Sequence, residues 1–313
     1  MKKTKKIISI LLITVLCACA LILLCSCLPY EIVHVDGVYA LVYDSGNTAT
    51  VYGFDKSEHV GVYEAQVCFV PEKIYYDGES YTVTELSVGE ERYGGELVVG
   101  GHVKKLVIPK TVTYIDLFGF NRSDTFDYLE EIEVHKDNQY YASFGGALYS
   151  KDFTTLIMYP PAKRDTTMTI HSNTTEIYDS HWNYCNKYVE KVSVGAGNTV
   201  FSDMDGVLLS HGGTKLEYVP YGHSGVLELP NGVQTIASMS LRYANVEHMY
   251  IPASVNSVEL VGDIMYNPFR YVANLYFEEA EPQYIAGWSR YLNEVQRGVS
   301  REQFQELVNP TEI

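Results

Sequence analysis

The hexapeptide VKKLVI, residues 103–108, carries the pattern that decides this fold: one apolar residue, two polar residues, then apolar residues at the fourth and sixth positions. Four later segments repeat it: LEEIEV (129–134), VEKVSV (189–194), VEHMYI (246–251) and VANLYF (272–277). One such unit cannot bury its apolar side alone, whereas stacked copies share one continuous core. The sequence therefore predicts an architecture of repeats.

A second phrase follows some of these copies, as in LVIPKTVTYI (106–115), MTIHSNTTEI (168–177), LELPNGVQTI (227–236) and MYIPASVNSV (249–258). It predicts a short strand, a break at proline or at its substitute His171, and a return with an apolar residue at every third position. Proline suits a strand end because its missing N–H group is harmless there. The predicted strands centre on positions 106, 132, 168, 192, 227, 249 and 275. Their base period of 22 to 26 residues lies in the range of leucine-rich repeats.

Two longer intervals between strands have a common explanation. Residues 138–163 align without gaps on residues 198–223, at a shift of 60. Each segment holds an apolar run, a polar turn and a second apolar run that ends at Pro160 or Pro220. This order predicts a β-hairpin that is inserted into the coil and projects from one edge.

The combination of xIPxxVxxI coils with this hairpin resembles the BspA-type leucine-rich repeat proteins, a family of bacterial surface-exposed and secreted proteins. The resemblance covers roughly residues 101 to 281. The first hairpin departs from the family pattern with Gly145-Gly146, whereas the second keeps Asp205-Gly206. The resemblance implies a mainly β, right-handed solenoid that attaches to ligands on host or neighbouring cells.

The chain divides into four predicted parts. Residues 1–27 form a lipoprotein-type signal sequence, 28–100 a β-rich N-terminal cap, 101–281 the solenoid and 282–313 a helical C-terminal cap. The first cap contains a predicted hairpin and two degenerate repeat strands. In the last part, Ser300 and Gln303 form a capping-box signature before an apolar run, and Pro310 ends the predicted helix. One or two helices are expected over residues 283–308.

The leader combines lysines at positions 2, 3, 5 and 6 with an apolar run from Ile7 to Ser26, which indicates export. Residues 24–27, LCSC, resemble the lipobox of bacterial lipoproteins, in which the last cysteine, here Cys27, is lipidated and becomes the mature N-terminus. The alternative is an uncleaved membrane-spanning helix, since about 20 apolar residues suffice to span a bilayer. In both cases the body is anchored at the outer face of the cell membrane.

The charge balance disfavours some partners. Asp and Glu number 39 against 23 Lys and Arg, a formal net charge of −16. Nucleic acid is disfavoured because phosphate binding needs clustered basic residues, and a polybasic grip on anionic lipid is disfavoured for the same reason. Outside the leader the only cysteines are Cys68 and Cys185. They form either one disulfide or two buried free thiols.

Known catalytic and metal-binding motifs do not occur in the sequence. There is no HExxH motif, no CxxC pair and no phosphate-binding loop. The segment Gly222–Gly225 is one residue short of a serine-nucleophile elbow, and Asp203–Gly206 lacks the other ligands of an EF-hand. No catalytic residue, metal or cofactor is therefore expected.

The middle residue of each repeat strand should point away from the core, since side chains alternate along a strand. This places in one outward row the residues Val107, Glu133, Thr169, Ser193, Glu228, Tyr250 and Tyr276. Tyrosine is abundant, 27 of 313 residues, and is enriched in binding surfaces. Glu228, Tyr250 and Tyr276 are the predicted contact patch, with Glu133 further along the row.

The sequence as a whole favours a monomeric, lipid-anchored binding or adhesion protein that recognises a protein or glycan ligand without catalysis. Two alternatives remain open. One is an envelope scaffold that binds a partner of the same cell, and the other is a hydrolytic enzyme with an unrecognised site.

Overall fold

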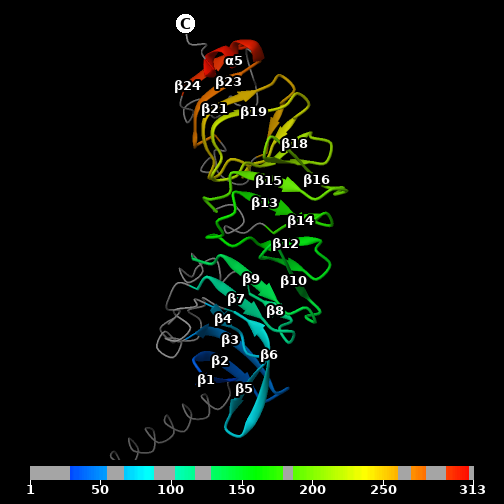
Figure 1. The fold of residues 1–313 in the computed structure, drawn as a ribbon, viewed down its shortest axis with the longest axis vertical. Helices are drawn as coiled ribbons and strands as arrows, with labels where there is room; N and C mark the ends of the chain where they lie inside the picture. Colours follow the sequence, from blue (N-terminus) through cyan, green and yellow to red (C-terminus); the bar gives the residue numbers. More distant parts are fainter. Residues whose placement is uncertain are drawn as a thin grey trace, which may run out of the picture.

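The computed structural model describes residues 29–54, 67–87, 103–116, 128–178, 186–259, 269–279 and 294–309. They form an elongated stack of coils with strand β1 (Glu31–Val35) near one end and helix α5 (Arg301–Val308) at the other, as Figure 1 shows. In this part of the chain no helix is long and apolar enough to cross a membrane. The leader with Cys27, and Cys185, lie outside the described residues.

Each coil begins with a strand of what we call the first ladder, the set of parallel strands along one side of the stack. All seven predicted repeat strands are present there, and β4 and β24 join them. The ladder consists of three separate parallel sheets: β4 (Val67–Phe69), β7 (Lys105–Ile108) and β9 (Glu131–Val134); β13 (Thr167–Ile170) and β15 (Lys191–Val194); β19 (Ser224–Glu228), β21 (Asn245–Ile251), β23 (Val272–Phe277) and β24 (Glu294–Arg297).

A second ladder of parallel strands lies across the core from the first. Several of its members are only two residues long and lie in the return segments that follow the first-ladder strands. Its strands are β3 (Thr48–Phe54), β6 (Glu79–Leu86), β8 (Tyr114–Ile115), β12 (Thr155–Met158), β14 (Glu176–Ile177), β18 (Lys215–Tyr218), β20 (Thr235–Ile236) and β22 (Ser257–Val258).

The two predicted hairpins are present, but each does more than project from an edge. As predicted, β11 (Ala147–Ser150) forms an antiparallel pair with β12, which runs up to Pro160, and β17 (Val207–Ser210) forms one with β18, which runs up to Pro220. A strand that was not predicted, β10 (Tyr141–Phe144) or β16 (Phe201–Met204), precedes each pair and makes a hairpin with β11 or β17. The next strand in each case, β12 or β18, pairs antiparallel with the hairpin and parallel with the second ladder. Each hairpin is therefore built into the second ladder.

The hairpin turns also divide the first ladder. The carbonyl oxygen of Gly146 accepts a hydrogen bond from Ile132 N at 2.8 Å, and that of Gly206 accepts one from Val192 N at 2.8 Å. These turns occupy the exposed edges of β9 and β15, where the next repeat strand would otherwise pair. The prediction of one continuous row is corrected on this point: the row crosses three sheets.

One type of turn closes four antiparallel pairs. Both central residues have positive φ, at 49° and 74° for Asp36-Gly37, 49° and 82° for Asp77-Gly78, 56° and 77° for Gly145-Gly146, and 52° and 83° for Asp205-Gly206. Positive φ at both positions defines the type I′ turn, which matches the twist of a hairpin. The Gly-Gly pair of the first hairpin thus forms the same turn as the Asp-Gly pair of the second.

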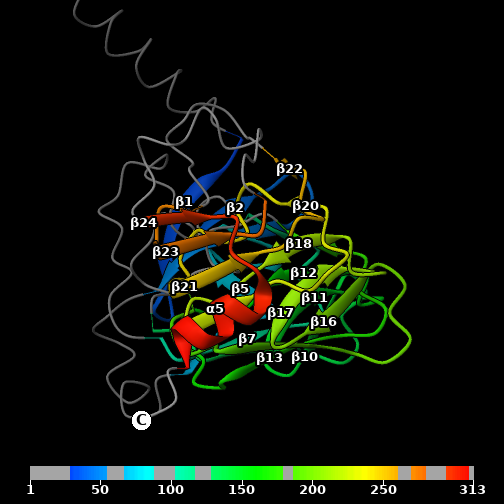
Figure 2. The same cartoon turned by 90° about the horizontal axis from the view of Figure 1, so that it is seen from above.

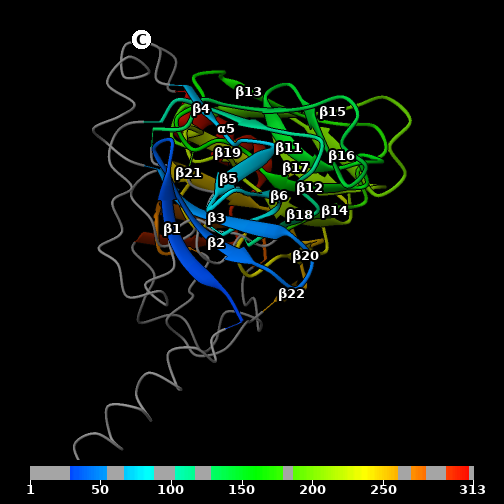
Figure 3. The same cartoon turned by 90° about the horizontal axis from the view of Figure 1, so that it is seen from below.

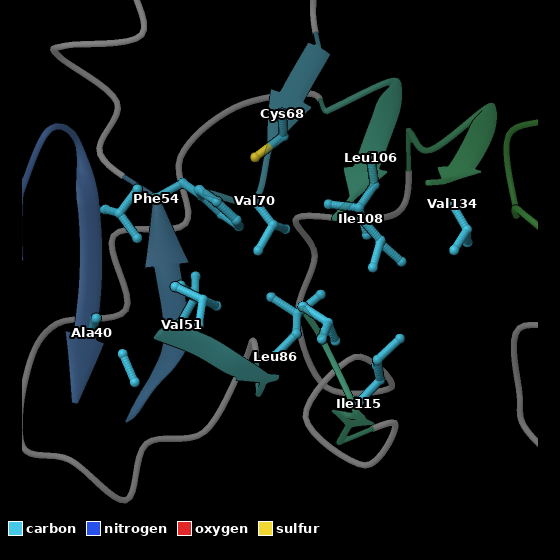
Figure 4. Close-up of a cluster of buried hydrophobic side chains, with 14 of the residues drawn as sticks. Ala40, Val51, Phe54, Cys68, Val70, Leu86, Leu106, Ile108, Ile115 and Val134 are labelled. Atoms are coloured by element: carbon cyan, nitrogen blue, oxygen red, sulfur yellow. The ribbon is translucent and has the colours of Figure 1, made fainter. Parts of the chain in front are cut away.

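The core lies between the two ladders. In Figure 4, Leu106 and Ile108 of β7 approach Leu86 of β6 and Ile115 of β8. This cluster also includes residues of β2 (Val38–Tyr43) and β3, so the N-terminal cap and the first coils share one core. Cys68 lies in it as a free thiol, 2% exposed, and burial raises its pKa.

The cap closes the N-terminal end of the stack. Strands β1, β2 and β3 form an antiparallel meander, and β5 (Lys73–Tyr76) pairs antiparallel with β6. Figure 3 shows these strands from below. The two degenerate repeat strands expected in this region are confirmed as β4 of the first ladder and β6 of the second.

Helix α5 closes the C-terminal end, and its predicted capping box is confirmed. Gln303 N donates to Ser300 Oγ at 3.2 Å, and Ser300 N donates to Gln303 Oε1 at 2.8 Å. The expectation of one or two helices over residues 283–308 is wrong for Glu294–Arg297, which form strand β24, and residues 283–293 lie outside the described residues. Val295 pairs with Leu275 there, because the open edge of β23 satisfies its backbone groups by adding one more parallel strand.

Candidate functional site

The outward face of the first ladder is the surface on which the predicted binding residues lie. Burial alternates along β7, β9 and β13, with Leu106, Ile132 and Met168 inside. Their neighbours Val107, Glu133 and Thr169 therefore point outward, as predicted. The three sheets nevertheless differ in how much of this face is open.

The C-terminal third of the face is covered by α5. Tyr250 and Tyr276 point to the predicted side but are only 0% and 5% exposed, because Phe304 packs on them. Its ring centroid lies 5.1 Å from that of Tyr250 and 5.0 Å from that of Tyr276. Burial raises the pKa of the Tyr250 hydroxyl to about 12 and also raises that of Tyr276. In Figure 2, α5 lies against β21.

Glu228 is engaged by the same helix. Arg301 Nη1 forms an ion pair with Glu228 Oε1, and Arg301 Nη2 donates to Leu229 O at 2.9 Å and to Asn231 Oδ1 at 3.0 Å. The guanidinium also lies 4.9 Å from the centroid of the Tyr250 ring. The structure thus brings Glu228, Tyr250 and Tyr276 together, but beneath the chain's own helix. A ligand would reach them only where α5 is displaced.

In the N-terminal two thirds of the face, each described outward residue is at least partly exposed. Phe69 pairs in register with Val107, which pairs with Glu133, and the Phe69 side chain is 61% exposed. Lys105 Nζ lies 2.6 Å from Glu133 Oε2 and 3.0 Å from Glu131 Oε1, and these contacts, with Glu133 first, raise the lysine pKa. We call the outward residues Phe69, Val107, Glu133, Thr169 and Ser193 the open face.

Phe69 was not among the predicted binding residues, although the sequence contains a signal for it. Residues 65–70, AQVCFV, fit the repeat phrase with Cys68 and Val70 at its fourth and sixth positions, and the structure buries both. Phe69 then falls in the outward phase. Glu133, the other predicted residue, lies on this open part, in a different sheet from Glu228.

An acidic hollow of about 420 Å³ lies at the cap end. It is lined by Glu31, Asp44, Asn47, Tyr76, Asp77, Glu79 and Tyr81. Tyr81 Oη donates to Asp44 Oδ1 at 2.8 Å, and this bond is the main reason that the Tyr81 pKa is raised to about 12. Over the ranges that the structure describes, no group of three or more His, Cys, Asp or Glu side chains is arranged to hold a metal.

The Gly222–Gly225 segment lies in a loop that runs into β19, as expected from the repeats. His223 is partly buried there, and burial lowers its pKa. Gly222 N donates to Val189 O at 2.8 Å, so this segment is fastened to the preceding coil.

No protein-family model and no curated protein matches the chain. The pneumococcal vaccine antigen PcpA is 18% identical over 78% of this chain and 69% of that chain, with a TM-score of 0.44. A leucine-rich repeat protein from Eubacterium ventriosum is 15% identical, with coverage of 86% and 77% and a TM-score of 0.42. A leucine rich cell surface protein from Faecalibacterium prausnitzii is 12% identical, with coverage of 90% and 99% and a TM-score of 0.32.

The names of the second and third of these solved structures give them as leucine-rich proteins of bacteria, the class that the coil and hairpin motifs predict. At these identities and TM-scores, the assignment of a repeat solenoid rests on the strand pairing of the chain itself.

Proposed function

We propose that the chain is a non-catalytic binding protein of the cell surface that contacts a protein or glycan ligand through its open face. The observation that supports this most is the exposure of Phe69 in register with Val107, on a parallel sheet. Large exposed aromatic side chains on a rigid sheet supply contact area without a loss of backbone entropy. Glu131, Glu133 and Lys105 form a polar rim beside this apolar pair.

The test is a plate-binding assay of residues 28–313 against matrix proteins, glycans and intact cells. We expect Phe69→Ser to weaken binding about tenfold, which corresponds to about 1.4 kcal/mol. The matched control is Tyr75→Ser, because Tyr75 is 66% exposed on β5, away from the open face. Equal losses for the two variants, or no binding by the folded parent protein, would contradict the proposal.

We further propose that Cys27 carries the lipid anchor that holds this body at the outer face of the membrane. The motif at residues 24–27 supports the assignment, and a multiply acylated terminus holds firmly where a single chain would not. Metabolic labelling with a fatty acid, followed by detergent partition, tests it. Cys27→Ala should abolish the label and release the protein, whereas Cys25→Ala should change neither. Retention of unlabelled Cys27→Ala in the membrane would favour an uncleaved anchor.

A further inference from the structure

Two sheets of the first ladder present the same set of outward groups at the same position of the repeat. Each of these groups lies between two buried residues of its strand, and strand pairing sets neighbours side by side. We call the two in-register sets the N-terminal row and the C-terminal row: Phe69, Val107 and Glu133, and Glu228, Tyr250 and Tyr276. Both rows hold two adjacent apolar or aromatic side chains and one glutamate, in opposite order along the stack.

The C-terminal row shows what kind of segment such a row holds. Besides the Arg301 ion pair and the Phe304 packing, Gln305 Nε2 donates to Glu228 Oε2 at 3.4 Å, and Val308 packs on the same small cluster. The contacting residues of α5 are therefore the first, fourth, fifth and eighth of the helix. This spacing is one face of a helix, and it is the pattern by which amphipathic helices bind in grooves.

The repeats of helix and sheet match in this arrangement. Three helical residues rise by about 4.5 Å, and paired strands lie about 4.8 Å apart. A helix that crosses the strands therefore presents residues three apart to neighbouring strands. Arg301 accordingly contacts β19 through Glu228, whereas Phe304 contacts Tyr250 of β21 and Tyr276 of β23.

The N-terminal row has the same groups but faces solvent. Phe69 is 61% exposed and the Glu133 side chain 53%, and Val107 between them is partly exposed. In the C-terminal row the two tyrosines are buried by α5. Burial of apolar surface is the main favourable term in association, so the apolar pair of the N-terminal row is suited to the same kind of cover.

The charges around the N-terminal row favour a cationic partner. Lys105 is shared by Glu133 at 2.6 Å and Glu131 at 3.0 Å, so one cation serves two carboxylates. Charged residues nearby are paired with one another: Lys104 with Glu130 at 3.6 Å, Arg164 with Glu130 at 4.0 Å and Lys110 with Glu72 at 3.3 Å. A guanidinium from a partner can pair with Glu133 while Lys105 stays paired with Glu131, and arginine binds carboxylates in a bidentate manner.

We propose that the N-terminal row binds a short amphipathic helix of another protein, in the manner in which the C-terminal row binds α5. The helix sets an aromatic or leucine side chain on Phe69 and Val107, and an arginine three residues before it pairs with Glu133. Because the order of groups is reversed, this helix runs from β9 toward β4, opposite to α5. In a second copy of the chain α5 is already engaged, since its Phe304 is 0% exposed.

This inference rests on the proposed function, because it names the class of partner for the open face. The probe is a labelled peptide with the sequence of residues 299–309, VSREQFQELVN. An isolated helix of this length is marginal, so a lactam joins positions 302 and 306 through Glu302→Lys and Glu306, both of which are exposed on α5. Fluorescence anisotropy measures its binding to residues 28–313.

We expect the peptide to bind the parent protein, and Phe69→Ser to weaken this binding at least about tenfold. Phe304→Ala in the peptide should have the same effect, because it removes the apolar anchor. The matched control in the protein is Tyr75→Ser, 66% exposed on β5, which should leave the affinity unchanged.

A charge exchange tests the ion pair. The peptide with Arg301→Glu should lose most of its affinity for the parent protein and recover it with the protein variant Glu133→Lys. The control is Glu176→Lys, exposed on β14 of the second ladder, which should restore nothing. Recovery with both variants would show a general effect of charge and would overturn the specific pairing.

Peptide binding that Phe69→Ser leaves unchanged would place the peptide on the C-terminal row, in exchange for α5, and would overturn the proposal. A parent dimer that Phe69→Ser dissolves would also overturn it, because a second copy would then be the occupant. If no peptide binds but Phe69→Ser loses binding to matrix, glycans or cells, the open face is a binding site whose partner is not a helix. If Phe69→Ser changes neither assay, the proposed function fails as well.

Discussion

At the scale of single residues, three buried asparagines hold the turns between coils. Asn138 Nδ2 donates to Pro109 O and to Val112 O at 2.9 Å each, and its Oδ1 accepts from Tyr140 N and Tyr141 N at 2.8 Å. Asn198 makes the equivalent bonds 60 positions later, and Asn186 makes a related set. Backbone N–H and C=O groups in the buried turns have no partner strand, so they need hydrogen bonds from side chains such as these.

Replacement of Asn138 by alanine should lower the free energy of unfolding by about 3 kcal/mol, because buried backbone groups lose their partners. A urea titration measures this through the shift of its midpoint. Asn256→Ala is the control, since Asn256 is exposed, and it should change stability by less than about 0.5 kcal/mol. Similar midpoints for the two variants would show that water replaces the Asn138 amide.

Buried tyrosines make the fold sensitive to alkaline pH. Tyr149 is 0% exposed, and burial raises the pKa of its hydroxyl to about 12. Between about pH 10, where an unfolded tyrosine ionises, and pH 12, the native state binds the proton more tightly. Stability should therefore be intact below pH 10 and fall as the pH rises further. In urea titrations across this range, Tyr149→Phe should lose less stability than the parent; an identical loss would contradict the prediction.

At the scale of elements, α5 decides which part of the outward face is available. Its burial on Tyr250 and Tyr276 depends on Phe304, which is 0% exposed, and on the Arg301 contacts with Glu228 and Leu229. The predicted strand alternation placed the tyrosines on the correct side of the sheet. The covering helix could not be inferred, because Arg301 and Glu228 are 73 positions apart and no local pattern links them.

Phe304→Ala should release α5 from the sheet, since it removes the one fully buried side chain of the helix. A loss of about 3–4 kcal/mol in local stability is expected. Acetylation of tyrosines, read by mass spectrometry, should then reach Tyr250 and Tyr276. Leu307→Ala, on the same helix but 51% exposed, is the control and should leave both tyrosines protected. Protection of both tyrosines in Phe304→Ala would show that Arg301 alone holds the helix.

At the scale of the whole molecule, the described residues form three large successive core clusters and a small one under α5. One joins the N-terminal cap to the first coils, one lies between the hairpins, and one fills the C-terminal coils. Each coil contacts mainly its neighbours, so a destabilising substitution should first promote unfolding of the cluster that contains it. The cap is therefore expected to unfold together with the first coils.

Leu86→Ala tests whether the cap and the first coils unfold together. Leu86 is 0% exposed in the first cluster, and its truncation should cost about 2–4 kcal/mol. Hydrogen exchange should then accelerate in β2 and β3 and equally in β7 and β9, with less change in β21 and β23. Ile236→Ala, 0% exposed in the C-terminal cluster, should give the opposite distribution. Faster exchange in the cap alone would show that it folds as a separate domain.

The sequence by itself determined the repeat strands, the two hairpins and the capped C-terminal helix, because each rests on a local signal. Apolar spacing marks the strands, Asp-Gly and Gly-Gly pairs favour the type I′ turns, and Ser300 with Gln303 marks the helix start. Only the tertiary structure decided that the hairpin turns divide the first ladder, that Glu294–Arg297 extend it, and that α5 covers Tyr250 and Tyr276. These features depend on contacts between segments far apart in the chain. Local periodicity specifies which face a residue presents, whereas packing of distant segments determines whether that face meets solvent.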